Sequence, residues 1–253
     1  MYRQKEIKTE ELKLKDGIVI IGSDIHIPFH DPKAVKAFGE YCKELQPAAI
    51  ILNGDVLDFY KLSRFVKGEG RNPYEEITYC QELLKELKDS CPNSLIYYVI
   101  GNHETRLETY VLNNAPHLAS LVEDVFSIIK TKDIGVKGCA EVLINDSFVC
   151  THGKLLGSKA GLSAIKEIEK HYMSGASGHT HRLAKFLTRK ARRKFVWLET
   201  GCLCDLNPEY VQDPDWQQGF AVIQFEKGKL KRAEVVEIED GEVLWYSRKR
   251  YAT

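Results

Sequence analysis

Residues 95–104 read LIYYVIGNHE, and this stretch decides the fold. Its first six residues are apolar or aromatic, which is the length and composition of a buried strand. The polar run Asn102-His103-Glu104 follows after a single glycine. Such a run makes a poor core and a poor helix interior, so it indicates a functional loop at the end of the strand.

Two earlier stretches repeat this pattern. Residues 17–26 read GIVIIGSDIH and residues 48–55 read AAIILNGD, so each apolar run again ends in polar residues. Helical patterns follow at 32–45 and at about 74–89. Continuously apolar strands that alternate with helices predict an α/β fold whose sheet is covered on both faces. Because ligand sites in open α/β sheets lie outside the carboxyl ends of the strands, the three loops should converge on one place.

The rest of the chain is expected to contain two more helical stretches and a β-rich end. We expect mainly helix over 105–133 and over about 159–172. Strands are expected at 141–144, 148–150, 183–189, 194–200, 219–226, 229–238 and 242–247. The first 14 residues are expected to form a lead-in or an edge element. The region 219–247 would either complete a second sheet or form a dimer edge, which leaves the oligomeric state open.

The composition excludes several classes of protein. Lysine and arginine (36) balance aspartate and glutamate (36), so any binding of polyanions must come from a local patch. No apolar run approaches 18 residues and the opening residues lack the apolar core of a signal peptide, so no membrane partner is expected. Seven cysteines without a Cys-x-x-Cys pair predict buried thiols in a cytoplasmic protein, with Cys202 beside a metal site as the alternative.

Eight polar residues stand at the predicted strand ends and in two later motifs. They are Asp24, His26, Asp55, Asn102, His103, His152, His179 and His181, and they include five of the chain's eight histidines. Carboxylate, amide and imidazole groups without thiolate suit a divalent ion such as manganese, iron, zinc or cobalt. Side chains alternate along a strand, so His179 and His181 can face one region only from an irregular loop, which Gly178 would permit.

Taken together, these motifs resemble the signature of the calcineurin-like metallophosphoesterases. That signature runs Asp-x-His, Gly-Asp, Gly-Asn-His-(Asp/Glu), His and Gly-His-x-His. Every position of it is present within residues 17–203, as Asp24-Ile25-His26, Gly54-Asp55, Gly101-Asn102-His103-Glu104, His152 and Gly178-His179-Thr180-His181. The resemblance implies a four-layer α/β/β/α sandwich of two mixed sheets flanked by helices, with its site at the strand ends, in a single domain over 1–253.

The resemblance also implies a binuclear metal centre. One ion would be held by Asp24, His26, Asp55 and His181. The second would be held by Asp55, Asn102, His152 and His179, with Asp55 bridging the two. We expect two manganese ions, with iron, zinc, nickel and cobalt as alternatives, because these ligands accept several first-row ions. Two such cations about 3.5–4 Å apart can generate hydroxide near neutral pH and clamp a phosphoryl oxygen.

Other residues surround the metals in this family. The resemblance implies that His103 acts as general acid or electrostatic stabiliser for the leaving group, and that Asp58 orients it. A turn carboxylate is the alternative for Asp58, and Glu104 is expected to brace its loop rather than to bind metal. The candidate substrate contacts are Arg106, Arg64, His30 and Arg182. A solvated surface position is the alternative for the arginines.

The most distinctive segment outside the signature runs from Arg182 to Lys194. It holds seven basic residues in thirteen and no acidic one, and it follows directly on His181. We expect a β-hairpin with a basic tip beside the metals. One interpretation is a positively charged surface that binds the phosphate backbone of DNA or RNA. The other is a solvated hairpin that blunts an exposed sheet edge.

These features predict a metal-dependent phosphoesterase with a preference for phosphodiester bonds of nucleic acid or nucleotides. The basic segment favours this substrate, and so does a short chain that leaves no room for a large domain over the site. A phosphomonoesterase acting on nucleotides, phosphoproteins or small esters is the alternative, favoured by the Asp58–His103 pair. A non-catalytic scaffold is a remote alternative, because such relatives typically lose ligands that are all present here.

Overall fold

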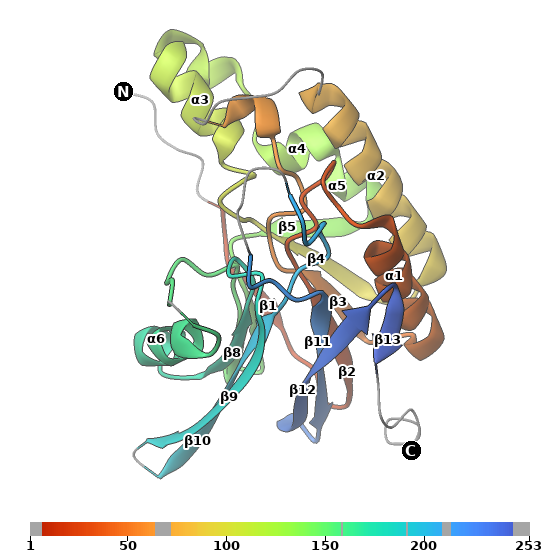
Figure 1. Ribbon diagram of the computed structural model, residues 1–253, viewed down its shortest axis with the longest axis vertical. Helices are drawn as coiled ribbons and strands as arrows, with labels where there is room; N and C mark the ends of the chain where they lie inside the picture. Colours follow the sequence, from red (N-terminus) through yellow and green to blue (C-terminus); the bar gives the residue numbers. More distant parts are fainter. Residues whose placement is uncertain (1–6, 64–71, 158, 191, 209–213, 245–253) are drawn as a thin grey trace.

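Two mixed β-sheets pack face to face, with helices on the outer face of each (Figure 1). The computed structural model describes residues 7–63, 72–157, 159–190, 192–208 and 214–244. The layers follow the order helix, sheet, sheet, helix, which is the predicted four-layer sandwich. Because each strand buries both of its faces in such an arrangement, the continuous apolar runs of the sequence are explained.

The larger sheet is built around the three predicted strands. β2 (Gly17–Gly22), β3 (Ala49–Leu52) and β4 (Leu95–Val99) are parallel neighbours. A fourth parallel strand, β5 (Val136–Cys139), pairs with β4 and was not predicted, because its sequence Val-Lys-Gly-Cys lacks an apolar run. Parallel pairing places the carboxyl ends of these strands at one edge, where the three polar loops begin.

The C-terminal strands extend this same sheet. β11 (Gly219–Glu226) pairs antiparallel with β2, and β12 (Lys229–Glu239) and β13 (Glu242–Leu244) follow in a meander. The prediction that 219–247 completes the second sheet is therefore wrong for residues 219–244, since β11 occupies the open side of β2 instead, and residues 245–247 lie outside the described residues. The strands are joined by the turns expected at Lys227-Gly228 and Asp240-Gly241. All four turn residues have positive φ, as tight hairpin turns require.

The smaller sheet has the order β1-β6-β7-β8-β10-β9. Its strands are β1 (Glu10–Leu12), β6 (Val142–Ile144), β7 (Phe148–Cys150), β8 (Ser174–Ser177), β9 (Leu183–Lys190) and β10 (Arg193–Thr200). The first described strand lies at one edge, as the polar lead-in predicted. β9 and β10 form the expected hairpin, which leaves β9 at the other edge.

Helices cover the outer face of each sheet. α1 (Pro32–Leu45), α2 (Pro73–Ser90), α4 (Val125–Ile129) and α5 (Thr131–Ile134) lie on the larger sheet, and α6 (Leu162–His171) lies on the smaller one (Figure 1). The helical region expected over 105–133 is divided into α3 (Arg106–Asn114), a 3-10 turn (Pro116–Leu121), α4 and most of α5. Pro116 ends α3, because a proline disfavours helical backbone in the residue before it. In the described ranges, no helix combines the length and apolar composition needed to cross a membrane.

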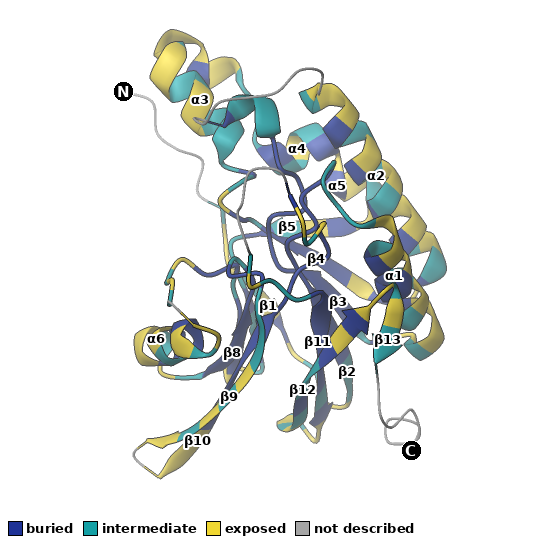
Figure 2. Cartoon of the chain, viewed as in Figure 1, coloured by how far each residue is buried: buried dark blue, intermediate teal, exposed yellow. Residues whose placement is uncertain are grey.

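Three apolar clusters correspond to the three interfaces between the layers. One packs α1 and α2 on the larger sheet, with Phe38 and Leu84 against Ile50. The second lies between the two sheets, and the third packs α6 against Trp197 of β10. All seven cysteines are buried free thiols, as predicted. Buried residues thus run through both sheets, whereas the far end of the β9–β10 hairpin is exposed (Figure 2).

Glu76 is a buried carboxylate in the first turn of α2. Its Oε2 accepts a hydrogen bond from the Phe59 N–H at 2.7 Å, which joins α2 to the loop that follows β3. Its Oε1 has no hydrogen-bond partner within the described part of the chain. Burial, reinforced by the nearby Asp58 carboxylate, raises the pKa of Glu76 to about 7.

We expect Glu76→Gln to gain stability over the wild type as the pH rises. Glu76 retains its proton to about pH 7 in the folded protein but ionises near pH 4.5 in the unfolded chain. Wild-type stability is therefore lost over this interval, and a neutral amide does not share the loss. In urea titrations, the free energy of unfolding of the variant minus that of the wild type should rise by on the order of 2 kcal/mol between about pH 5 and about pH 8. Parallel profiles for the two proteins would contradict this assignment.

Candidate metal centre

Five loops bring the predicted site residues to one edge of the sandwich. Three of the loops follow β2, β3 and β4 in the larger sheet. The other two follow β7 and β8, which are parallel neighbours in the smaller sheet. Together they carry Asp24, His26, Asp55, Asn102, His103, His152, His179 and His181. Residues separated by up to 157 positions thus meet because the strands that precede them end at the same edge.

Asp24, His26 and His181 form one cluster. Nε2 of His181 lies 3.2 Å from Oδ1 of Asp24 and 3.0 Å from Nε2 of His26. The Nδ1 of His26 lies 3.0 Å from the Asp58 carboxylate, which assigns the ring proton to Nδ1. Nε2 of His26 therefore faces the cluster. Although burial opposes it, Asp24, Asp58 and Asp55 raise the pKa of this ring, so a cation bound here would displace a proton from Nε2. Two ring nitrogens directed at each other in this way favour a cation between them.

Asp55, His152 and His179 form a second cluster with Asn102. Nε2 of His152 lies 3.1 Å from Oδ2 of Asp55 and 3.1 Å from Oδ1 of Asn102. Nδ1 of His152 donates to the backbone carbonyl of Asn53 at 2.9 Å, which directs Nε2 at the cluster. Although burial opposes it, Asp55 raises the pKa of His152 to about 9, so a cation bound here would displace a proton from Nε2. Ligand atoms of Asp55, His152 and His179 all lie within 4.8 Å of one another.

Asp55 stands between the two clusters. Its Oδ2 lies 3.1 Å from Nε2 of His152 and 3.9 Å from Nε2 of His26. Its Oδ1 accepts the backbone N–H of His103 at 2.9 Å, which fixes the orientation of the carboxylate. One carboxylate is thus directed at both groups of donors, as a bridging ligand would be.

The donor set fits two divalent cations. Each cluster combines carboxylate oxygen with imidazole nitrogen, the donors that suit first-row ions. Burial acts against ionisation of Asp24 and Asp55, but the facing histidines outweigh it and hold the pKa of both carboxyls well below the usual range. Burial lowers the pKa of His179 and His181, so these rings are neutral and able to bind metal.

Five of the candidate ligands have left-handed backbone. They are Asp24, His26, Asp55, His179 and His181, with φ between 52° and 69°. Residues with a side chain adopt this region at a cost of roughly 1–2 kcal/mol each. The left-handed backbone at His179 and His181 makes their loop irregular, so both side chains can face one region, as predicted. Strain of this kind concentrates at functional sites, where the surrounding structure holds it in place.

Glu104 braces two of the loops, as predicted. One of its oxygens accepts the N–H groups of Val56 and Leu57 at 2.8 and 3.0 Å, and the other accepts those of Asp55 and Gly101 at 3.0 and 2.8 Å. The Tyr98 hydroxyl donates a fifth hydrogen bond at 2.7 Å. All of this lies in the interior, where an unmade hydrogen bond is costly. Glu104 therefore sets the spacing between the loop after β3 and the loop after β4.

His103 stands at the border between the clusters and solvent. Its Nδ1 lies 3.1 Å from Oδ2 of Asp58, and its Nε2 lies 3.7 Å from Oδ2 of Asp55. Nη2 of Arg106 lies 2.9 Å from the same Nε2. Although burial favours protonation of Asp58, its bonds to His103 and His26 keep its pKa well below the usual range. The ionised Asp58 thus orients two imidazoles at once.

The calcineurin-like phosphoesterase family model matches residues 18–214, which is most of the chain. The chain belongs to this family. It is therefore a metal-dependent phosphoesterase, a hydrolase that acts on phosphate esters. The clusters described above supply candidate metal sites for that chemistry.

Several relatives resemble the phosphoesterase along nearly its whole length. The Gene 54 protein of Mycobacterium phage L5 is 27% identical over 241 residues, which cover 88% of this chain and 94% of the phage protein. The Gene 54 protein of Mycobacterium phage D29 is 25% identical over 242 residues, with the same coverage. The structure of Vacuolar Protein Sorting 29 from Cryptosporidium parvum matches with a TM-score of 0.51 and 19% identity, over 90% of this chain and 95% of that one. That last likeness concerns the fold alone.

Three of the four candidate substrate contacts of the phosphoesterase are already engaged. Arg106 donates to the Asp58 carboxylate at 3.0 Å and to its carbonyl at 2.7 Å. Arg182 donates to Asp215 at 2.8 Å and to the Gly157 carbonyl at 2.8 Å. Nε2 of His30 lies 2.8 Å from the hydroxyl of Tyr79 on α2. Arg64 lies outside the described residues.

Three contacts of the site were missed by the sequence analysis. The Trp216 ring packs edge-on against His181, with centroids 4.1 Å apart. The Cys204 sulfur lies 3.7 Å from Nδ1 of His181, and the ligand atoms of Cys202, Cys204 and His181 lie within 4.8 Å of one another. The backbone carbonyl of Asn53 orients His152. The position of Cys202 agrees with the alternative that the sequence offered for it, beside a metal site. Trp216 carried no signal, because it stands in a loop without periodic pattern.

The basic segment 182–194 does not gather beside the metal residues. It forms the predicted hairpin, but β9 leads away from His181 for eight residues before the chain turns back. At a rise of about 3.3 Å per residue, its basic tip lies roughly 23 Å from the start of the strand. The expectation of a patch beside the metals is therefore wrong, because most of the charge is at the opposite end of the sheet.

Glu104→Gln should strongly destabilise the phosphoesterase. An amide nitrogen cannot accept, so it would face two or three of the donors that now bind the carboxylate. We expect the free energy of unfolding to fall by at least about 3 kcal/mol in urea titrations, because several buried N–H groups lose their partner. Tyr98→Phe is the matched control, since it removes one donor and should cost only about 1 kcal/mol. Equal losses in the two variants would contradict the bracing role.

Gly178→Ala should weaken metal binding. A Cβ at this position would overlap Oδ2 of Asp24 and Oγ of Ser23. The Asp24 carboxylate would have to move, so we expect metal content, measured by mass spectrometry after dialysis, to fall by at least about half an ion per chain, taking about two ions for the wild type. Gly39→Ala in α1 is the control, because its Cβ meets nothing within 4 Å and should add about 0.5–1 kcal/mol of stability. Full metal content in Gly178→Ala would contradict the expectation that metal binding depends on the present position of the Asp24 carboxylate.

Proposed function

We propose that the enzyme hydrolyses phosphodiester bonds in nucleic acid or nucleotides. The observation that carries this proposal is the state of the two described arginines beside the site. Arg106 is paired with the Asp58 carboxylate at 3.0 Å and Arg182 with that of Asp215 at 2.8 Å. A monoester carries a second negative charge that free guanidinium groups typically neutralise. A diester lacks this charge, so it suits a site whose arginines are already compensated.

The two clusters would supply the metal ions that hydrolysis requires. Two divalent cations at the clusters would polarise a phosphoryl oxygen and make hydroxide available near neutral pH. Asp24, His26, Asp55 and their partners in the second cluster would hold these ions in place. We propose manganese, with iron, zinc, nickel or cobalt as alternatives, because mixed imidazole and oxygen donors accept all of them.

His103 is proposed to protonate the leaving group. Asp58 holds Nδ1 of the ring, so the proton that is transferred would be carried on Nε2, and the 2.9 Å contact with the Arg106 guanidinium, which can only donate, is made when Nε2 is unprotonated. As the P–O bond breaks, the Nε2–H bond breaks and an O–H bond forms on the departing oxygen. The neutral ring that results presents a lone pair on Nε2, which the Arg106 guanidinium is placed to satisfy at 2.9 Å. Arg106 would thus position His103 rather than bind the phosphate of the substrate.

A phosphomonoesterase is the second candidate. The observation in its favour is the 3.1 Å pair between Asp58 and His103, since a firmly oriented acid helps a poor alkoxide to leave. We also propose a cytoplasmic location, because seven buried free thiols suit a reducing compartment.

The first experiment compares bis-p-nitrophenyl phosphate with p-nitrophenyl phosphate in the presence of Mn²⁺. We expect kcat/KM to favour the diester by at least about tenfold. Asp55→Asn should abolish both activities, because it weakens the carboxylate shared by the two clusters. His103→Ala should lower kcat by about 10² or more on an alkyl diester such as a dinucleotide, and by less on the nitrophenyl diester, whose leaving group needs little protonation.

Two results would overturn parts of this proposal. A preference for the monoester would overturn the diester proposal and favour phosphatase chemistry. Equal losses on the two diesters in His103→Ala would exclude the general-acid role and leave electrostatic stabilisation.

A further inference from the structure

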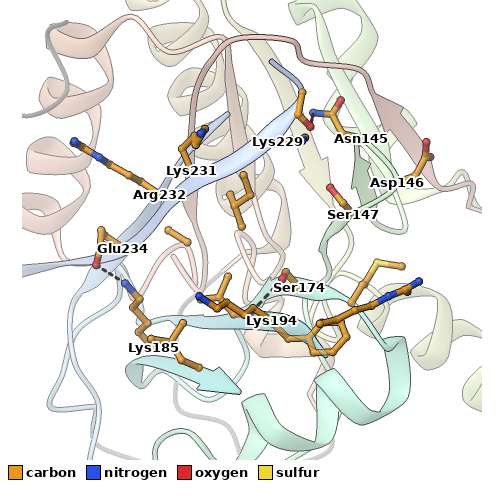
Figure 3. Close-up of a pocket in the computed structure, with 18 of the residues that line it drawn as sticks. Asn145, Asp146, Ser147, Ser174, Lys185, Lys194, Lys229, Lys231, Arg232 and Glu234 are labelled. Carbon is orange, nitrogen blue, oxygen red and sulfur yellow. Dashed lines mark hydrogen bonds and ion pairs between the residues drawn. The ribbon is translucent and has the colours of Figure 1, made fainter. Parts of the chain in front are cut away.

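A groove opens between the two sheets, at the end of the sandwich away from the metal residues. It lies between the β9–β10 hairpin and β12 and has a volume of about 890 Å³ (Figure 3). β10 runs parallel to β8, whose carboxyl end leads into the loop of His179 and His181, so the start of β10 lies at the far end. From Lys194 to Thr200 at a rise of about 3.3 Å per residue, the groove is roughly 20 Å from the metal edge.

The groove is strongly cationic in a chain of zero net charge. Its lining includes two acidic residues, Asp146 and Glu234, and six basic ones. The basic residues are Lys185, Arg193, Lys194, Lys229, Lys231 and Arg232. Figure 3 shows Lys229, Lys231 and Arg232 along one strand, across the groove from Lys185 and Lys194.

Both acidic residues are already paired. Oδ2 of Asp146 lies 2.6 Å from Lys13, which is outside the groove, and Oε2 of Glu234 lies 2.8 Å from Lys185. As far as the structure describes the chain, no carboxylate lies within 4 Å of Arg193, Lys194, Lys229 or Lys231. Among the described residues, the groove therefore keeps an excess of positive charge at Arg193, Lys194, Lys229 and Lys231.

Positions that should be apolar carry this charge. Alternation along β10 places Lys194 on the same face as Val196 and Leu198, which pack between the two sheets. Leu187 of β9 is paired with Val196 in the hairpin, yet it is 67% exposed. The inner face of the hairpin thus changes from core to charged surface, so the sheets separate here instead of closing on each other.

The hairpin also pairs like charges directly. Arg193 faces Lys190 and Lys194 faces Arg189 in the β9–β10 register. Like charges at directly opposed positions destabilise a strand pair. A hairpin that only needed to protect a sheet edge could alternate lysine with glutamate at no such cost. Lys190 is partly compensated by Glu169 at 3.8 Å, but the directly opposed Lys194 and Arg189 favour an anion at this end of the hairpin.

The floor of the groove is suited to flat apolar groups. Leu187, Leu230 and the half-exposed Tyr172 line it, whereas Phe195 is buried on the α6 side of β10 and supports the Tyr172 ring. The rings of Tyr172 and Phe195 lie 5.5 Å apart. Cations around an apolar and aromatic floor are the arrangement that proteins use for single-stranded nucleic acid, whose phosphates take the charge while the bases stack.

We infer that this inter-sheet groove binds single-stranded nucleic acid as an exosite for the metal centre. The choice of nucleic acid rests on the proposed diesterase function, whereas the anion site rests on the groove alone. A strand rising about 3.4 Å per nucleotide needs about six nucleotides to reach from the groove to the metal edge. Short nitrophenyl esters therefore cannot use the groove, and long substrates can.

The test measures binding apart from hydrolysis. Fluorescence anisotropy with a labelled oligothymidylate of about 20 nucleotides is recorded in EDTA, at about 50 to 200 mM salt. We expect Lys194→Glu/Lys231→Glu to weaken binding at least tenfold at the lowest salt and to make the slope of log K against log salt shallower by about 1.4 or more. The matched control, Lys36→Glu/Lys85→Glu, makes the same change in net charge on α1 and α2 and should bind as the wild type does.

Thermal unfolding separates a lost contact from a lost fold. The carboxylate introduced by Lys194→Glu would face Arg189 as an opposite charge, so the Tm of this single variant should equal or exceed that of the wild type. A lower Tm together with weaker binding would instead assign Lys194 a structural role and overturn the inference.

The remaining outcomes are equally definite. Equal binding by the two double variants, or no binding by the wild type, would overturn the inference. Displacement of the oligonucleotide by polyglutamate at equal charge concentration would replace nucleic acid with an acidic polypeptide as the partner. Binding without hydrolysis of the nitrophenyl diester in Mn²⁺ would retain the groove and reject the diesterase, and hydrolysis without binding would do the reverse.

Discussion

The carboxylate of Glu104 is the interaction on which the rest of the site depends. It accepts four backbone N–H groups and one hydroxyl in the interior of the protein. Those N–H groups belong to two loops that leave neighbouring strands, and none of the four is satisfied within a strand or helix. Because one side chain completes both loops, Asp55 and the Asn102-His103 pair are held in a fixed relation. The spacing of the metal residues is thus determined by the same bonds that close the sheet edge.

This bracing is needed because the site is costly in itself. Five candidate ligands have left-handed backbone, and ionised carboxylates and imidazoles are crowded into a buried region. Such arrangements persist only where the surrounding structure determines them. Here the surroundings are three apolar clusters, one between the two sheets and one between each sheet and its helices. The apolar strands of the sequence therefore serve the site directly, since they fix the positions from which the strained loops start.

Local patterns predicted the parts of the molecule that depend on local physics. The strands ending at Gly22, Leu52 and Val99 were readable from apolar runs, and the site residues from the polar chemistry that follows them. Which of the two sheets β11, β12 and β13 would join could not be predicted from the sequence. That choice depends on the open edge of β2, which lies far away in the sequence. The direction of the basic hairpin was misjudged for a similar reason. Its first residue adjoins a metal ligand, but the strand that follows carries the charge away from it.

The two ends of β10 show why that direction matters for function. Its inner face begins with Lys194, continues with Val196 and Leu198 in the core between the sheets, and ends near the metal residues. Charges about 20 Å from the metals act through more than two Debye lengths at physiological salt, where the screening length is about 8 Å. The cationic groove therefore cannot raise the local concentration of a small phosphate ester at the metals. It can act only on a substrate long enough to touch both ends, so under the proposed function the fold would separate binding of a polymer from cleavage of one of its bonds.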